Sequence, residues 1–247
     1  MRDHPSRQEQ PAPLLGVVCL AQFMVLLDVS IVNVALPSIQ HALSFTTDSL
    51  QWVINIYTIT FGGLLMLGGR AADLFGQRRV FIAGTVLFAV ASLACALASS
   101  QGELLAARGA QGIGSALVSP ATLSIVTSSF AKSEQRNRAV AVWAAMGALG
   151  GSLGARLGGL LTQTFGWPAI FAVNVPIGAV IVTSALHFVP AHRPAKGQGS
   201  PDLAGAALVT LGLGAVTYAV VRTDHLGWGS AGVLAPLTRE SPCSPPS

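Results

Sequence analysis

The fold class is decided by one apolar stretch near the start of the chain, Leu14-Leu15-Gly16-Val17-Val18-Cys19-Leu20-Ala21-Gln22-Phe23-Met24-Val25-Leu26-Leu27-Asp28-Val29-Ser30-Ile31-Val32-Asn33-Val34-Ala35-Leu36. It is long enough to cross the roughly 30 Å hydrocarbon core of a bilayer, because a spanning helix needs about 20 mostly apolar residues. It is too long for the apolar part of a cleavable signal peptide. It therefore predicts a retained first spanning helix, preceded by a polar tail over residues 1–13.

The composition extends this prediction to the whole chain. Of 247 residues, 51% are hydrophobic and only 10% are charged, whereas about a quarter of the residues in a soluble domain are charged. Further apolar runs cover residues 50–67, 80–99, 104–125, 139–161, 170–189 and 203–221. None alternates with the two-residue period of a strand, which excludes a β-barrel. We predict an all-α integral membrane protein.

Lys and Arg are concentrated in alternate connections between these runs. Ten of the 14 lie in residues 1–13, 68–79, 126–138 and 190–202, whereas residues 37–49, 100–103 and 162–169 contain none. Positively charged connections face the cytoplasm. We therefore predict a cytoplasmic N-terminus and a cytoplasmic loop over residues 190–202.

Other classes of protein have little support. The net charge of +4 does not indicate nucleic-acid binding, because the basic residues form no patch. The three cysteines show no CxxC spacing and no neighbouring histidine pair, so no metal site is expected. The five histidines are scattered, and no GxSxG, HExxH or P-loop occurs. We expect no catalytic residue and no cofactor. That the chain is a receptor or a scaffold is not excluded by the sequence.

Three residues that are charged at neutral pH fall inside the apolar runs: Asp28, Arg108 and Arg156. Each costs about 2.5–3.5 kcal/mol to insert at the centre of a spanning helix, so each needs a partner, a water-filled cavity or a function. Two interpretations of Asp28 and Arg108 stay open. They form a structural ion pair, or Asp28 loads and releases a proton as a cavity opens to either side, with Arg108 controlling that protonation.

The connection after the second run reads Gly69-Arg70-Ala71-Ala72-Asp73-Leu74-Phe75-Gly76-Gln77-Arg78-Arg79. Gly69 and Gly76 allow a tight turn and close helix approach. Asp73 is expected near the start of the third span, where a helix N-terminus stabilises a carboxylate. The segment resembles the signature loop of the major facilitator superfamily, with Ala71 and Gln77 as departures. The resemblance implies a conformational-switch loop formed by Gly69, Asp73, Gly76, Arg78 and Arg79.

Further segments resemble the branch of drug:proton antiporters with fourteen helices (EmrB/QacA type). They are Leu27-Asp28-Val29-Ser30-Ile31-Val32-Asn33-Val34-Ala35-Leu36-Pro37 and Asp202-Leu203-Ala204-Gly205. Arg108-Gly109-Ala110-Gln111-Gly112-Ile113-Gly114 is similar to a fourth-helix motif of the whole superfamily, and Asn174-Val175-Pro176-Ile177-Gly178 resembles the family's entry into the sixth helix. The resemblance implies a six-helix transporter bundle over residues 14–189 and a linker helix over residues 203–221. It also implies a fourth-helix motif, associated with proton transfer, formed by Arg108, Gln111, Gly112 and Gly114.

The fifth run departs from this branch, whose antiporter motif reads GPxxGG. Here the segment is Gly154-Ala155-Arg156-Leu157-Gly158-Gly159. The glycines persist, but Ala155 replaces the proline and so removes the kink that a proline imposes. Two interpretations of Arg156 stay open. It faces the central cavity and helps bind an anionic substrate, or it impairs antiport.

The resemblance ends soon after the seventh run. Residues 231–238 would span only about 12 Å as a helix, and residues 239–247 are polar and rich in proline. We expect a chain truncated relative to the family, with a disordered tail over residues 222–247 and little transport activity alone. A second transporter half is an expected partner.

The function implied by the resemblance is proton-coupled efflux (antiport) of drugs, antibiotics or other lipophilic small molecules across a bacterial plasma membrane. Its expected partners are the lipid bilayer, protons and the substrate. The alternative is a non-transporting membrane fragment or scaffold that pairs with another transporter half.

Overall fold

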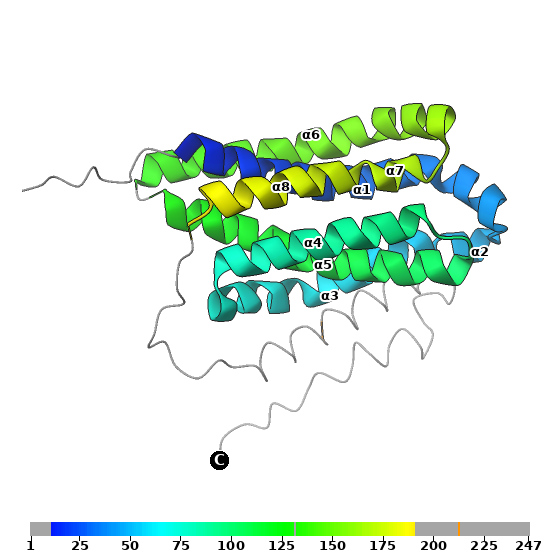
Figure 1. Cartoon of the computed structure of the whole chain (residues 1–247), viewed down its shortest axis with the longest axis horizontal. Coiled ribbons are helices and arrows are strands. Elements are labelled where there is room, and N and C mark those ends of the chain that lie inside the picture. Colours follow the sequence, from blue (N-terminus) through cyan, green and yellow to red (C-terminus); the bar gives the residue numbers. More distant parts are fainter. Residues whose placement is uncertain (1–10, 131, 191–211, 213–247) are drawn as a thin grey trace, which may run out of the picture.

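The computed structural model describes residues 11–130, residues 132–190 and residue 212, and all regular structure in this part of the chain is helical. The elements are α1 Pro11–Leu43, α2 Thr47–Leu50, α3 Trp52–Phe75, α4 Gln77–Ala96, α5 Gln101–Ser129, α6 Ser133–Phe165, α7 Ala169–Ala172 and α8 Asn174–Phe188. The short α2 leads into α3 and the short α7 into α8. Six helical segments therefore run the length of a bundle (Figure 1).

The predicted all-α membrane class is confirmed, and the first six apolar runs each correspond to one of these segments. The predicted seventh helix over residues 203–221, residue 212 apart, lies outside the described residues, as does the predicted tail over residues 222–247. Four of the helices, α1, α3, α5 and α6, are longer than the corresponding apolar runs. α1, for example, continues through Pro37 to Leu43, because the proline removes only one backbone donor while Ile39 beyond it is fully buried.

Five of the six segments are long and apolar enough to cross a membrane, judged by length and composition: residues 12–43, 47–75, 77–96, 133–165 and 169–188. The sixth, α5, is 29 residues long but contains Arg108, Gln111 and many glycines and serines. It lies against α3 and α4 and also contacts α1. Four polar residues in the middle of α5 are buried by these neighbours, namely Arg108, Gln111, Ser115 and Thr122, which is how a polar helix is accommodated within a membrane bundle.

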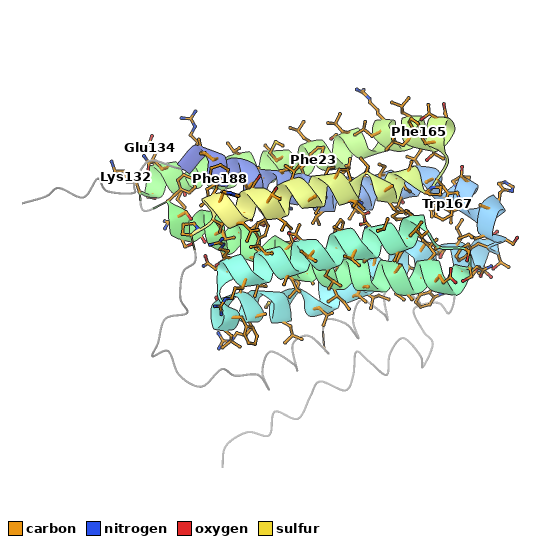
Figure 2. The ribbon with its side chains drawn as sticks, viewed as in Figure 1. Phe23, Lys132, Glu134, Phe165, Trp167 and Phe188 are labelled. Atoms are coloured by element: carbon orange, nitrogen blue, oxygen red, sulfur yellow. The ribbon has the colours of Figure 1, made fainter. Side chains whose placement is uncertain are left out.

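The two basic connections that the structure describes, between α3 and α4 and, residue 131 apart, between α5 and α6, lie at the same end of the bundle. Figure 1 shows the turn from α3 to α4, the connection from α5 to α6 and the end of α8 together at this end. In Figure 2, Lys132, Glu134 and Phe188 mark it, whereas Phe165 and Trp167 lie toward the opposite end. The helix arrangement is therefore compatible with the charge asymmetry of the sequence. That this end faces the cytoplasm stays a prediction.

The core consists of two apolar clusters separated by a polar layer. One cluster includes Val25 of α1, Phe88 of α4 and Val118 of α5. The other includes Ile31 of α1 and Leu104 of α5. Between them, the same three helices contribute buried polar side chains, namely Asp28, Ser92, Arg108, Gln111 and Ser115. The polar residues of the sequence thus form a layer inside the bundle.

The packing of α6 on α1 depends on small residues. Gly147, Gly150, Gly154 and Gly158 recur every three or four residues and are buried. A Cβ added at Gly150 would lie 2.5 Å from the carbonyl oxygen of Phe23, and one at Gly154 would lie 2.6 Å from Cβ of Ser30. Such spacing lets two helix backbones approach closely, so this side of α6 is fixed by contact with α1.

We predict that Gly150→Ala destabilises the bundle, whereas Gly151→Ala does not. The added methyl at position 150 meets the α1 backbone, while at position 151 no atom lies within 4 Å. Overpacking of this kind typically costs about 1–3 kcal/mol, and alanine is otherwise favoured over glycine in a helix by about 1 kcal/mol. Thermal unfolding of both purified variants in the same detergent measures the difference. Equal unfolding temperatures would contradict the packing.

Candidate functional site

The polar layer is centred on an ion pair between α1 and α5. Nη1 of Arg108 donates to Oδ2 of Asp28 at 2.6 Å, and the two side chains are 1% and 0% exposed. Taking two charges out of water costs several kcal/mol per ion, so a buried pair persists only with good geometry and further hydrogen bonds. The further hydrogen bonds to the pair come from Gln111 on α5 itself and from two other helices, α3 and α8.

Gln111 connects both charges to α4. It lies three residues after Arg108, on the same face of α5, and its Oε1 accepts from Nη1 of Arg108 at 2.7 Å. Its Nε2 donates to Oδ1 of Asp28 at 2.8 Å and to Oγ of Ser92 at 2.7 Å. The Sγ of Cys95 lies 3.6 Å from the same Oε1. Both ends of this amide are therefore occupied.

Arg108 is held by α3 as well. Its Nε donates to the carbonyl oxygen of Val53 at 3.1 Å, and its guanidinium carbon lies 4.2 Å from the ring centroid of Tyr57. Phe171 of α7 presents a second ring at 5.8 Å. Aromatic faces stabilise a desolvated guanidinium, and the hydroxyl of Tyr57 is itself hydrogen-bonded to Ser115 at 2.7 Å. The cation is thus held on several sides.

Asn174, the first residue of α8, completes the cluster. Its Nδ2 donates to Oδ1 of Asp28 at 3.0 Å, and the side chain is fully buried. With it, α1, α3, α4, α5 and α8 all contribute to one hydrogen-bonded network. Asp28 accepts three side-chain hydrogen bonds. A buried carboxylate requires such hydrogen bonds, because an unpaired polar group inside a protein is costly.

The glycines of the fourth-helix motif bring α5 close to its neighbours. A Cβ at Gly112 would collide with the side chain of Thr60 and with the backbone of Tyr57. One at Gly114 would lie 2.8 Å from the backbone nitrogen of Phe88. Side chains at these two positions would force α5 away from α3 and α4. Arg108 and Gln111 reach their partners because these two positions are glycine.

The predicted switch loop is mostly helical, which corrects the sequence analysis. Gly69 lies inside α3, and Asp73 lies in the last turn of α3 instead of near the start of the third span. Its carboxylate is exposed and lies 3.8 Å from the guanidinium of Arg70. The helix continues because no residue interrupts it before Gly76, whose φ of 93° is accessible chiefly to glycine. Only Gly76 lies between α3 and α4.

The close approach that the sequence analysis attributed to Gly69 belongs to Gly68. A Cβ at Gly68 would collide with the backbone of Ala116, whereas one at Gly69 would make an ordinary contact of 3.7 Å with Pro120. Of the two loop arginines, Arg78 donates to the carbonyl oxygen of Leu186 near the end of α8, at 2.6 Å. Arg79 is exposed.

The altered fifth-helix motif lies away from the charge cluster. α6 is continuous through Ala155. Gly154 and Gly158 contact α1, and a Cβ at Gly159 would lie 3.9 Å from Val34. Arg156 is exposed, on the side of α6 turned away from the glycines that contact α1. The structure therefore does not bring Arg156 together with Asp28 and Arg108.

The cluster includes contributors that were not predicted from the sequence, among them Ser92, Asn174 and the carbonyl oxygen of Val53. Asn174 offered a signal, because an amide inside an apolar run needs a polar partner. Ser92 and Val53 offered none, since a small hydroxyl is tolerated in any helix and a backbone carbonyl is present at every position.

Comparison with known proteins agrees with this architecture. The chain matches the family model of the Major Facilitator Superfamily over residues 18–237. It is 42% identical over 234 residues to the cephamycin export protein CmcT of Amycolatopsis lactamdurans, covering 94% of this chain and 48% of the relative. It is 38% identical over 233 residues to the methylenomycin A resistance protein of Streptomyces coelicolor, again covering 94% and 48%.

A third relative is the multidrug resistance protein Stp of Mycobacterium tuberculosis, 39% identical over 218 residues, which are 88% of this chain and 40% of that protein. The crystal structure of the POT family transporter PepTSo shares the fold, with a TM-score of 0.67 and 17% identity over 93% of this chain and 51% of that one. The chain spans about half the length of the relatives it matches or less.

These findings define a helical, multi-pass protein of the bacterial plasma membrane. The chain belongs to the major facilitator superfamily.

We predict that Asp28→Asn and Arg108→Gln each destabilise the bundle strongly, and that the double variant loses less than the sum of the two. Each single change leaves one buried charge without its counter-charge, which typically costs about 3–5 kcal/mol, whereas the double change removes both charges. Denaturant titrations in mixed micelles give the coupling free energy of the cycle. Additive losses would show that the pair is not coupled.

Proposed function

We propose that this chain forms the N-terminal helix bundle of a fourteen-helix transporter that exports drugs or antibiotics in exchange for protons. The observation that supports this most directly is the buried carboxylate of Asp28, bonded to α5 and α8 through Arg108, Gln111 and Asn174. The relatives are named for cephamycin export, methylenomycin A resistance and multidrug resistance, which supports a drug or antibiotic as the substrate.

Proton coupling follows from the chemistry of the pair. In the described arrangement Asp28 neutralises Arg108, and both oxygens of the carboxylate accept hydrogen bonds. A proton on Asp28 would leave the guanidinium buried without a counter-charge, which is costly in a low-dielectric interior. Protonation therefore favours an arrangement in which Arg108 reaches water or another anion. Proton binding and helix arrangement are linked in this way, and linkage acts in both directions.

The substrate would bind to the neighbouring surface of α1 and shift the same equilibrium between helix arrangements. Val29, the residue after Asp28, is exposed, as are Asn33 and Val34 along the same helix. A lipophilic molecule bound there would contact the helix that carries the proton site. A substrate that prefers one helix arrangement shifts the population toward it, and so changes the protonation of Asp28.

A second helix bundle is the partner we propose for the exposed faces of α3 and α6. These faces expose large apolar residues, namely Leu65, Met66, Phe75, Leu149, Leu153, Leu157 and Leu160. An apolar groove of about 320 Å³ also runs between α3 and α5, lined in part by Leu67, Leu74 and Leu117. The match to about half of a PepTSo chain fits a bundle that works with another. Arg156 lies on the exposed side of α6, where an anionic substrate or the second bundle would meet it.

Transport by paired halves tests the proposal. We would reconstitute this chain into liposomes alone, and together with the second half of the cephamycin export protein, and impose a pH gradient. We expect drug or cephamycin uptake driven by the gradient from the paired halves and little from the chain alone. Asp28→Asn should abolish the gradient-driven component, because no proton can then bind at position 28. Thr85→Val, which removes a buried hydrogen bond elsewhere, serves as the control.

Two results would contradict the proposal. Uptake that is equally fast with and without the gradient, or unchanged in Asp28→Asn, would separate transport from proton binding at this site. Gradient-driven uptake by the chain alone would show that a second bundle is not needed.

A further inference from the structure

The amide of Asn174 has one end bonded and one end free. Its Nδ2 donates to Asp28, but its Oδ1 is buried and has no hydrogen-bond partner among the described residues. Leaving a buried acceptor without a partner typically costs about 1–3 kcal/mol. Native proteins rarely retain such a group without a reason, and here the group lies beside the carboxylate of the charge cluster.

The reason is suggested by what Asp28 needs when it is protonated. A carboxylate only accepts hydrogen bonds, whereas a carboxylic acid also donates one, and a buried donor must find an acceptor. Three side chains are bonded to Asp28. Arg108 has donors only. The Oε1 of Gln111 already accepts from Arg108 at 2.7 Å, and its Nε2 is shared between Asp28 and Ser92.

Asn174 is the member of this set with an unused acceptor. Turning its amide by 180° exchanges Nδ2 and Oδ1 with almost no change in shape, because the two ends differ only in their hydrogens. The other titratable groups near Asp28 do not compete. The hydroxyl of Tyr57 on α3 is bonded to Ser115, and the thiol of Cys95 on α4 points to Gln111. In the described residues α6 supplies no hydrogen bond or ion pair to Asp28.

We infer that Asn174 is a positioning residue that serves both protonation states of Asp28. With Asp28 ionised, Nδ2 donates to the carboxylate. When Asp28 takes up a proton from water, the amide turns and its Oδ1 accepts the new O–H of Asp28. The proton stays on Asp28, and one hydrogen bond replaces another. The inference rests on the proposed function, because it assumes that Asp28 is protonated at some stage.

The consequence is a link between protonation and α8. When Asp28 is ionised, α8 is joined to α1 by the hydrogen bond that Asn174 donates to Asp28. When Asp28 is protonated, the two helices are joined by the hydrogen bond that Asn174 accepts from Asp28. A side chain that could only donate, or do neither, would leave one state with an unsatisfied buried group. α8 would then favour one protonation state of Asp28 over the other.

Infrared difference spectroscopy of the chain in lipid nanodiscs tests this directly. Lowering the pH should produce a carboxylic-acid C=O band that is absent in Asp28→Asn and is thereby assigned to Asp28. In Asn174→Leu, which has a similar size and no polar atoms, we expect the band to persist at a shifted frequency, because the acid has lost its partner. Thr85→Val also removes a buried hydrogen bond, from the Thr85 hydroxyl to the carbonyl of Phe81, and should leave the band unchanged.

The outcomes separate the inference from the proposed function. A band from Asp28 with the same frequency in Asn174→Leu would overturn the inference and leave proton coupling intact. No band from Asp28 in any protein, down to the lowest pH at which the bundle remains folded, would overturn both.

A second measurement covers the case in which Asn174→Leu does not fold. The chain contains four asparagines, at positions 33, 55, 137 and 174. With asparagine side-chain amides labelled with ¹⁵N, replacing the other three in turn assigns the signal of Asn174 by elimination. We expect that signal to shift on acidification in the wild-type chain and to stay constant in Asp28→Leu, which removes the carboxyl group without adding a fifth asparagine. An unchanged signal in the wild type would overturn the inference.

Discussion

The rest of the structure depends on how a carboxylate and a guanidinium are accommodated inside an apolar bundle. The pair of Asp28 and Arg108 separates the two hydrophobic clusters and draws α1 and α5 to the centre of the fold. A buried ion pair is weak evidence for stability, because well-packed apolar residues often stabilise a protein as much or more. The position of the pair in a membrane protein therefore favours a functional reason for keeping it.

The packing around the pair follows from the same constraint. Charged groups in the bundle need several hydrogen bonds, so several helices must approach closely, and close approach requires small residues. Gly112 and Gly114 bring α5 against α3 and α4, and Gly150 and Gly154 bring α6 against α1. The many glycines of the chain are thus explained in part by the geometry of the polar layer and of the helix next to it.

Much of this architecture was predictable from the sequence, because membrane burial leaves a strong pattern. The apolar runs located six spans, and the cost of a charge in a membrane singled out Asp28 and Arg108. The helix ends were less predictable, because polar residues such as Arg70 and Asp73 continue a helix once it extends beyond the apolar region. Hydropathy could not predict that the close approach occurs at Gly68 instead of Gly69, or that Asn174 lies beside Asp28. Both depend on how each helix is rotated about its own axis.

In the mechanism that we propose, protonation of Asp28 releases Arg108 and loosens the contact between α1 and α5. Amide hydrogen exchange measures this most directly, because it reports local opening of helices. After correction for the intrinsic effect of pH on exchange, we expect protection of α1 around Asp28 to fall on acidification in the wild-type chain. We expect protection in Asp28→Asn to be low at every pH at which this variant remains folded. Protection that is equally high in both proteins and independent of pH would contradict this mechanism.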